Sequence, residues 1–253
     1  MPRRGAPAPR SGAIIVTATE YARKRRSTAV RVAVLGFGLL LGGLFLNSPR
    51  TQPIALFCLV GGTITSWLGI ALMDRWVAVP RAEVALAAAL AEGGSLYTLY
   101  NWALPAAEHV IVAPWGLAVV HVFNTEGPLD IDGAKWHDRR PLWRRLLAFG
   151  RRTIRNPHAL IDADIAALRA AVAAADDTLA GVPITPVVVF TRPGLVLTTT
   201  APSPMAIRDI ELRGWLRDEG RRHSALAPGE ARRLKAVVAE LAEGRLGGVV
   251  PQA

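Results

Sequence analysis

Cysteine is almost absent from this sequence: Cys58 is its one thiol, and it lies inside a long apolar run. A single thiol excludes a disulfide within the chain, and it excludes a zinc site built from several cysteines. Lysine is also scarce, so arginine carries nearly all of the positive charge. The formal net charge of +10 favours contact with anions, either nucleic acid or the acidic face of a membrane, without choosing between them.

Charged residues are missing from two stretches, residues 32–46 and 53–73. A helix needs about 20 apolar residues to cross a bilayer, so the second stretch is long enough. The first becomes long enough if the helix begins near Ser27 and Arg31 extends to the interface. We therefore predict a hairpin of two transmembrane helices, over about 27–47 and 53–73. A buried soluble hairpin is the alternative, which two long uncharged runs so close together disfavour.

Aspartate, glutamate, lysine, arginine and histidine are absent from both stretches, which leaves no polar pathway through a single copy and disfavours a transporter or channel. Small residues are plentiful instead. Gly38 and Gly42 have the G-x-x-x-G spacing, and Gly62 with Ser66 repeats it, which lets helices approach closely. An oligomer formed through Gly38 and Gly42 is one expectation, and chance in a glycine-rich sequence is the alternative.

The distribution of basic residues predicts the orientation in the membrane. The turn between the spans has only Arg50, whereas the segment before the first span contains Arg3, Arg4, Arg10, Arg23, Lys24, Arg25, Arg26 and Arg31. The positive-inside rule then places both termini of a multi-pass protein in the cytoplasm, at the inner or plasma membrane. Residues 1–26, rich in proline, alanine and arginine, are expected to form a basic disordered tail. The run RKRR at 23–26 serves as a topology signal or binds anionic headgroups.

Residues 76–253 alternate between helical and strand patterns. Residues 108–116 and 116–124 are predicted to pair as a β-hairpin, and Asn156-Pro157 opens a long amphipathic helix that Gly181 ends. The apolar stretch 185–191 is predicted to be a central strand buried on both faces. This order predicts an α/β domain with helices that flank a small mixed sheet.

Several segments together resemble the nuclease-related domain (NERD) family, relatives of restriction endonucleases. They are YNWALPAAEHVIVAPWGLAVVHVFNTEG at 100–127, Trp136 after a glycine turn, Asn156-Pro157 before a helix, and VVVFTRP at 187–193. The resemblance covers roughly residues 83–216, and paired spans in front of the domain also fit bacterial members. It implies a restriction-endonuclease-like mixed sheet. It also implies a site with an aspartate on one strand and Glu-x-Lys on the next, whose carboxylates hold Mg²⁺.

The positions that match this site are Glu108 for the aspartate, His121 for the glutamate and Phe123 for the lysine. Glu108 can still bind a metal, but His121 is a poor Mg²⁺ ligand that accepts Mn²⁺ or Zn²⁺ instead. Phe123 cannot replace a lysine. His121 is therefore a structural residue, or alternatively a relocated general base. We commit to no catalytic residue and no metal ligand.

Acidic residues shortly after the predicted strand 116–124 could supply the metal ligands that the matching positions lack. Glu126, Asp130 and Asp132 could swing back, so the metal candidates are Glu108, His121 and Glu126. Carboxylates beside glycine turns are more simply turn formers.

The segment 139–155 is the other candidate site, since it interleaves aromatic and basic side chains. Its members are Arg139, Arg140, Trp143, Arg144, Arg145, Phe149, Arg151, Arg152 and Arg155. Arginine with aromatics suits a nucleic-acid backbone with stacked bases, or the headgroup layer of a membrane. In a chain already anchored, we favour headgroups. A solvated basic loop is the third interpretation.

The sequence therefore predicts a membrane-anchored, catalytically inactive binding or scaffold module at the cytoplasmic membrane face, with no cofactor. The alternative is a metal-dependent nuclease with a rearranged active site, which would use Mg²⁺ or Mn²⁺. Integral membrane insertion is expected in either case, and the partner is anionic lipid or nucleic acid.

Overall fold

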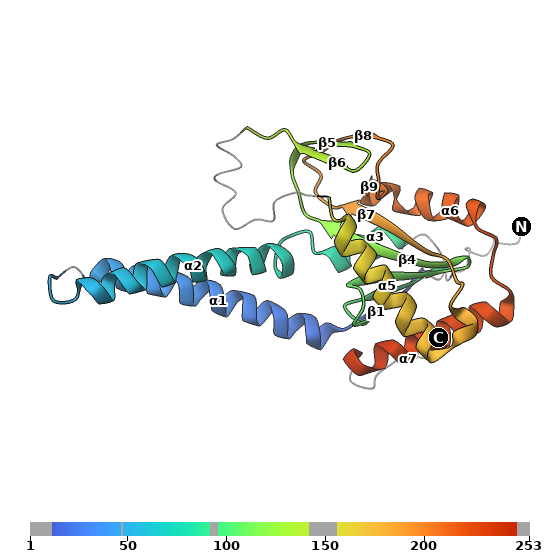
Figure 1. Cartoon of the computed structure of the whole chain (residues 1–253), viewed down its shortest axis with the longest axis horizontal. Coiled ribbons are helices and arrows are strands. Elements are labelled where there is room, and N and C mark those ends of the chain that lie inside the picture. Colours follow the sequence, from blue (N-terminus) through green and yellow to red (C-terminus); the bar gives the residue numbers. More distant parts are fainter. Residues whose placement is uncertain (1–11, 47, 92–95, 142–155, 247–253) are drawn as a thin grey trace, which may run out of the picture.

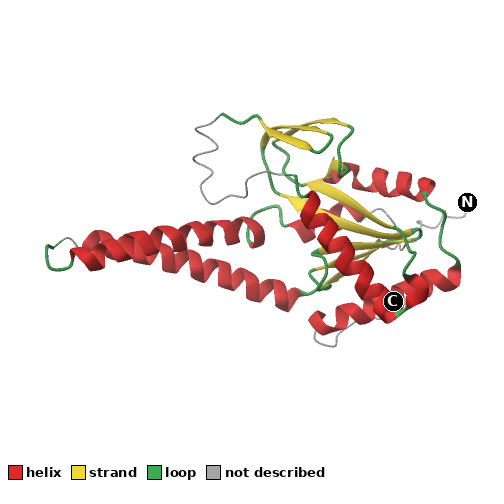
Figure 2. Cartoon of the chain, viewed as in Figure 1, coloured by secondary structure: helices red, strands yellow, loops and turns green. Residues whose placement is uncertain are grey.

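A long two-helix hairpin projects from an α/β domain (Figure 1). The structure, a computed structural model, describes residues 12–246 apart from 47, 92–95 and 142–155. The hairpin consists of α1 (Thr19–Phe45) and α2 (Gln52–Trp76). Figure 2 shows that the strands are confined to the domain, beyond the foot of this hairpin.

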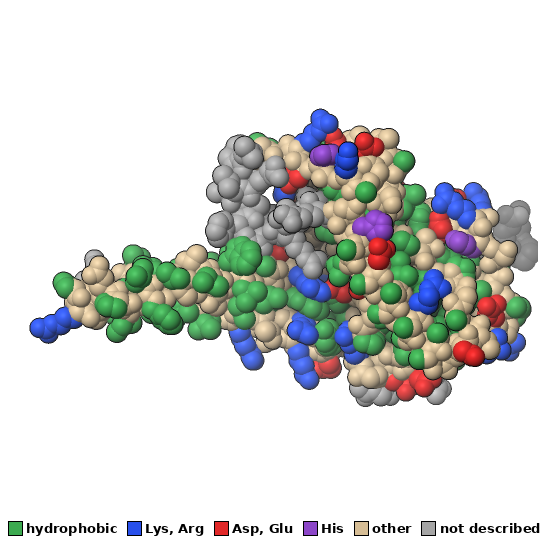
Figure 3. Space-filling view, viewed as in Figure 1, with side chains coloured by type: hydrophobic (Ala, Val, Ile, Leu, Met, Phe, Trp, Pro, Cys, Tyr) green, Lys and Arg blue, Asp and Glu red, His purple; other side chains and the backbone are tan. Residues whose placement is uncertain are grey.

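Two helices among the described residues, α1 and α2, are long and apolar enough to cross a membrane, each with a mean hydropathy of 1.9 in its most apolar window. Hydrophobic side chains cover the projecting part of the hairpin (Figure 3). The spans predicted over about 27–47 and 53–73 fall within or close to these helices. The helix α1 begins at Thr19, well before the predicted start near Ser27, so it has a polar foot that packs on the domain.

Small residues line the contact between α1 and α2. A Cβ added to Gly36 would lie 2.4 Å from the backbone nitrogen of Ser66, and one added to Gly69 would lie 2.5 Å from Cα of Ala33. Gly62 and Ser66 are both buried here, which confirms the close approach predicted for them. A Cβ on Gly38 or on Gly42 would have no neighbour within 4 Å, because both positions face away from α2. An oligomer through that face stays a prediction.

We expect Gly36→Ala to destabilise the full chain in detergent by about 1–3 kcal/mol, the usual cost of overpacking. The added methyl would collide with the Ser66 backbone, which has no flexible end to move aside. Gly38→Ala is the matched control and should be neutral or slightly stabilising, because alanine is the better helix former. Unfolding in mixed micelles measures both, and equal effects of the two substitutions would contradict this helix packing.

The segment before α1 is ordered, so the predicted disordered tail over 1–26 is wrong for residues 14–26. Residues 1–11 lie outside the described part. The strand β1 (Ile14–Thr17) pairs in parallel with β2 (Thr98–Asn101). The sequence IIVT favours a strand because three of its residues are β-branched aliphatics and the fourth is threonine. Ala18 and Ala22, just after it, are buried in the domain core, so this part of the chain folds with the domain.

The main sheet has six described strands in the order β1-β2-β3-β4-β7-β9. The remaining members are β3 (His109–Ala113), β4 (Gly116–Phe123), β7 (Ile184–Phe190) and β9 (Ala206–Arg208). The strands β3 and β4 form the predicted antiparallel hairpin, and β7 lies between β4 and β9 in parallel with both. Residues 187–190 are buried, which confirms the central strand predicted there.

A second sheet of three described strands lies beside the first, whereas the sequence predicted only one sheet. It runs β6-β5-β8, from β5 (Gly127–Asp132), β6 (Lys135–Asp138) and β8 (Leu195–Thr200). The glycine turn before Trp136 lies at Gly133, with φ of 55°, and it folds β5 and β6 into a hairpin.

Helices cover both faces of the main sheet. On one face lie α3 (Ala82–Leu90) and α6 (Leu212–Arg222), and on the other lie α5 (His158–Ala175), α7 (Pro228–Leu246) and the foot of α1. Single 3₁₀ turns at Asp177–Leu179 and Asp209–Glu211 follow α5 and precede α6. The predicted α/β class with a mixed sheet flanked by helices is thus confirmed, and a restriction-endonuclease-like arrangement stays a proposal.

Candidate functional site

A cleft of about 270 Å³ lies where the hairpin meets the domain. It brings together residues from five separate elements, and the three positions that match the nuclease site all line it. The polar and aromatic residues of its lining are Tyr21 of α1, Arg75 and Trp76 of α2, Trp102, Glu108, His121 and Phe123 of β4, Asp164 of α5, and Arg245 of α7.

Glu108, which immediately precedes β3, forms an ion pair with Arg75 in the last turn of α2. About a third of each side chain is exposed, so solvent screens the pair and its contribution to stability is small. The guanidinium of Arg75 also lies 5.6 Å from the ring centre of Trp76. The carboxylate that would hold a metal in the family site is therefore engaged by a cation that the hairpin supplies.

His121 points from β4 toward α5, where its Nε2 lies 3.2 Å from the carboxylate of Asp164. Burial raises the pKa of Asp164, and the positive charge of Arg75 partly opposes that rise. Sequence reasoning missed Asp164 because it stands 43 positions beyond His121 on another element, and no local pattern links the two. The contact fits the structural interpretation of His121 and also the geometry of an acid-base pair.

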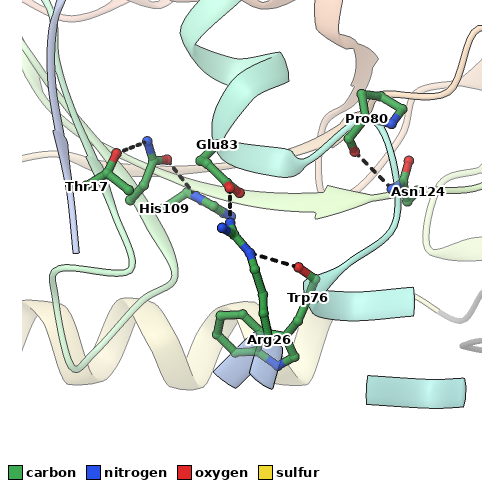
Figure 4. A network of polar contacts seen from close by, with 8 residues as sticks. Thr17, Arg26, Trp76, Pro80, Glu83, His109 and Asn124 are labelled. Carbon is green, nitrogen blue, oxygen red and sulfur yellow. Dashed lines mark hydrogen bonds and ion pairs between the residues drawn. The ribbon is translucent and has the colours of Figure 1, made fainter. Parts of the chain in front are cut away.

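His109 is the next residue after Glu108, but its side chain is buried and forms its hydrogen bond with Asn101 rather than with Glu108. Its Nδ1 is 2.8 Å from Oδ1 of Asn101, while the amide nitrogen of Asn101 donates to the Thr17 hydroxyl at 3.2 Å (Figure 4). Since that oxygen can only accept, Nδ1 of His109 is the donor and Nε2 carries a lone pair. Burial lowers the pKa of His109 to about 3, helped by the charges of His121 and Arg75. His109 is therefore neutral at physiological pH.

Phe123, at the lysine position, fills a hydrophobic contact between the two sheets. Its ring centre lies 5.9 Å from that of Trp136 on β6 and 5.9 Å from that of Phe190 on β7. The residue therefore packs in a cluster where a lysine would bury its charge.

The acidic residues that could have rescued a metal site are engaged elsewhere or point outward. Glu126 pairs with Arg192 at 2.7 Å, Asp130 pairs with Arg139, and Asp132 is exposed. Within the described ranges, no group of three or more His, Cys, Asp or Glu side chains could hold a metal ion.

Only the start of the basic segment 139–155 belongs to the described residues. Arg139 forms an ion pair with Asp130 on β5, and Arg140 forms one with Asp138 on β6 at 2.6 Å. Both arginines therefore contact the three-stranded sheet. The other candidates lie outside the described residues: Trp143, Arg144, Arg145, Phe149, Arg151, Arg152 and Arg155.

Side chains at the foot of the hairpin pack against the domain and form hydrogen bonds and ion pairs with it. Arg26 of α1 donates to the Trp76 carbonyl at 3.1 Å and pairs with Glu83 of α3 (Figure 4). Trp76 lies 6.0 Å from Tyr21 and 4.5 Å from Trp102, measured between ring centres. The feet of α1 and α2 therefore share a core with the wall of the cleft, and Arg26, one member of the run RKRR, bonds inside the protein.

Comparison of the chain with protein-family models, with curated proteins and with solved structures found no match.

Proposed function

We propose that this chain is a membrane-anchored binding or scaffold module without hydrolytic activity, held by α1 and α2 with its domain at the cytoplasmic face. The observation that carries the proposal is the ion pair between Glu108 and Arg75. A restriction-type nuclease needs that carboxylate on a metal ion that orients water and stabilises charge on the phosphate. Here the guanidinium of Arg75, on the anchoring helix α2, is bound to the Glu108 carboxylate instead.

The remaining two positions support the same proposal. Phe123 offers no group that could neutralise a transition state, because its ring packs against Trp136 and Phe190. His121 is turned toward Asp164 on α5. The NERD resemblance remains part of the proposal as an account of the origin of this domain. The three positions that match the family site, Glu108, His121 and Phe123, line one cleft.

One arrangement favours the alternative, a metal-dependent nuclease with a rearranged site. Glu108, His121 and Asp164 all line the same cleft, and an imidazole accepts Mn²⁺ where it would refuse Mg²⁺. This alternative requires Arg75 to leave Glu108 when a metal binds.

The test uses the full chain in detergent, because the foot of α1 and Trp76 belong to the domain core. It is incubated with single- and double-stranded DNA and RNA in Mg²⁺, Mn²⁺ or EDTA, at two salt concentrations. We expect no metal-dependent cleavage. Salt-sensitive retardation in a gel would assign nucleic-acid binding to the module, and its absence would direct the search to lipids and proteins.

Two variants decide a positive result. Cleavage that needs metal and disappears in Glu108→Ala, but survives in Glu20→Ala, would establish the alternative and overturn the proposed function. Glu20 is the matched control because it is also an arginine-paired glutamate, yet its partner is Arg23 on its own helix and it does not line the cleft.

A further inference from the structure

Two arginines from distant parts of the chain converge on the ring of Tyr21. The guanidinium carbon of Arg25 lies 5.1 Å from the ring centre, and that of Arg245 lies 4.6 Å from it. Arg25 also donates from Nε to the Tyr21 hydroxyl at 3.2 Å. The foot of α1 and the end of α7 thus each place one positive charge against the same aromatic side chain.

Neither arginine has a carboxylate partner among the described residues, although acidic groups are nearby. Glu20 on α1 is bound to Arg23 at 2.6 Å, and in the cleft Glu108 is bound to Arg75. Arg245 is fixed by main-chain carbonyls, chiefly that of Leu104 at 3.0 Å. Its orientation is therefore set while its charge stays uncompensated. An anion that contacted both guanidinium groups would compensate both charges.

The position of this arginine pair places it at the level of lipid headgroups. Trp76 follows the apolar run that ends at Met73 by three residues, a rise of about 4.5 Å along a helix. Tyr21 contacts Trp76, so it lies at the same depth, where tyrosine and tryptophan are enriched in membrane proteins. Figure 3 shows basic side chains gathered where the hairpin joins the domain. With the chain anchored as proposed, the phosphate groups of the lipids lie at this depth.

We propose that Arg25 and Arg245 bind the phosphate group of an anionic membrane phospholipid beside Tyr21. This rests on the proposed membrane anchorage and names a ligand for that module. A guanidinium presents parallel N–H groups that match two phosphate oxygens, so two arginines can engage one phosphodiester from two sides. The adjoining cleft, with Trp76 and Trp102 in its wall, takes the glycerol end of the headgroup.

The experiment measures binding of a short-chain phosphatidylglycerol to the full chain in neutral detergent, by isothermal titration. Arg25→Gln and Arg245→Gln should each weaken binding about tenfold, the loss of one charge-assisted contact. Arg23→Gln is the matched control, since Arg23 lies on the same helix but is already paired with Glu20. Its affinity should stay within about twofold of the parent chain.

Further arms separate the possible failures. Arg245→Lys keeps the positive charge but loses the paired N–H groups of the guanidinium, so its affinity for phosphatidylglycerol should lie between those of the parent chain and Arg245→Gln. A melting curve without lipid shows that each variant is folded. Equal affinity for phosphatidylcholine, equal competition by inorganic phosphate, or indifference of folded Arg25→Gln and Arg245→Gln would each overturn the lipid site. A protein that alkali strips from membranes would instead overturn the proposed anchorage.

Discussion

Replacing Trp76 with alanine is expected to cost about 3–5 kcal/mol, the usual range for a buried tryptophan, and so to remove much of the stability of the chain. The side chain is only 8% exposed although it ends a helix whose other end projects away from the domain. Its ring contacts Tyr21 on one side and Trp102 on another, and Arg75 lies over it. Its removal would leave a cavity where the hairpin and the domain meet.

Trp67 on the same helix is the matched control, because its side chain is 52% exposed on the apolar surface of the hairpin. Trp67→Ala should change the free energy of unfolding by no more than about 0.5 kcal/mol. Denaturation of both variants in detergent, followed by far-ultraviolet circular dichroism, measures the difference. Equal losses would mean that Trp76 does not join the hairpin to the domain.

Acid should lower the free energy of unfolding as the pH drops from 6.5 toward 3, and His109 alone should contribute roughly 1 kcal/mol for each pH unit. Burial holds the pKa of His109 near 3 in the folded chain, well below its ordinary 6.5. Between these values the unfolded chain binds a proton that the folded chain does not, so acid favours unfolding. Above pH 6.5 both states are neutral and this contribution disappears.

Chemical denaturation at pH 6.5, 5.5 and 4.5 isolates the contribution through His109→Gln, which removes the titrating group. The parent chain should lose more stability over this range than His109→Gln does, even if the variant is less stable throughout. His137→Gln is the control, since His137 is exposed on β6. A pH dependence that is identical in the parent and His109→Gln would contradict the burial of an uncharged imidazole.

Elements set by local pattern were predictable from the sequence. The hairpin of β3 and β4 is specified by two continuous apolar runs on either side of Pro114 and Gly116, and α5 begins where Asn156-Pro157 predicts. The long apolar helix α2 follows from an uncharged run of sufficient length. In each case the physical cause lies within about 20 residues of chain, which is the range that hydrophobic periodicity and turn chemistry report.

Features set by distant contacts were not predictable. The strand β1 is four residues long and pairs with β2 some 84 residues further on, so its basic surroundings suggested a tail. The partners Arg75 of Glu108 and Asp164 of His121 come from helices at unrelated positions in the sequence. The sequence indicated candidate positions, whereas the partners of Glu108 and His121 depend on contacts that form only in the folded chain.

Labelling with a membrane-impermeant maleimide tests the anchored, inward-facing domain most directly. Cys58, the single native thiol, lies within α2 and should stay unlabelled in intact bacterial cells and in opened membranes. In a chain with Cys58→Ser, Ser48→Cys in the turn between the spans should react in intact cells, and Thr200→Cys on β8 only after the cells are opened. Reaction of Cys58 without detergent, or of Thr200→Cys in intact cells, would contradict the account.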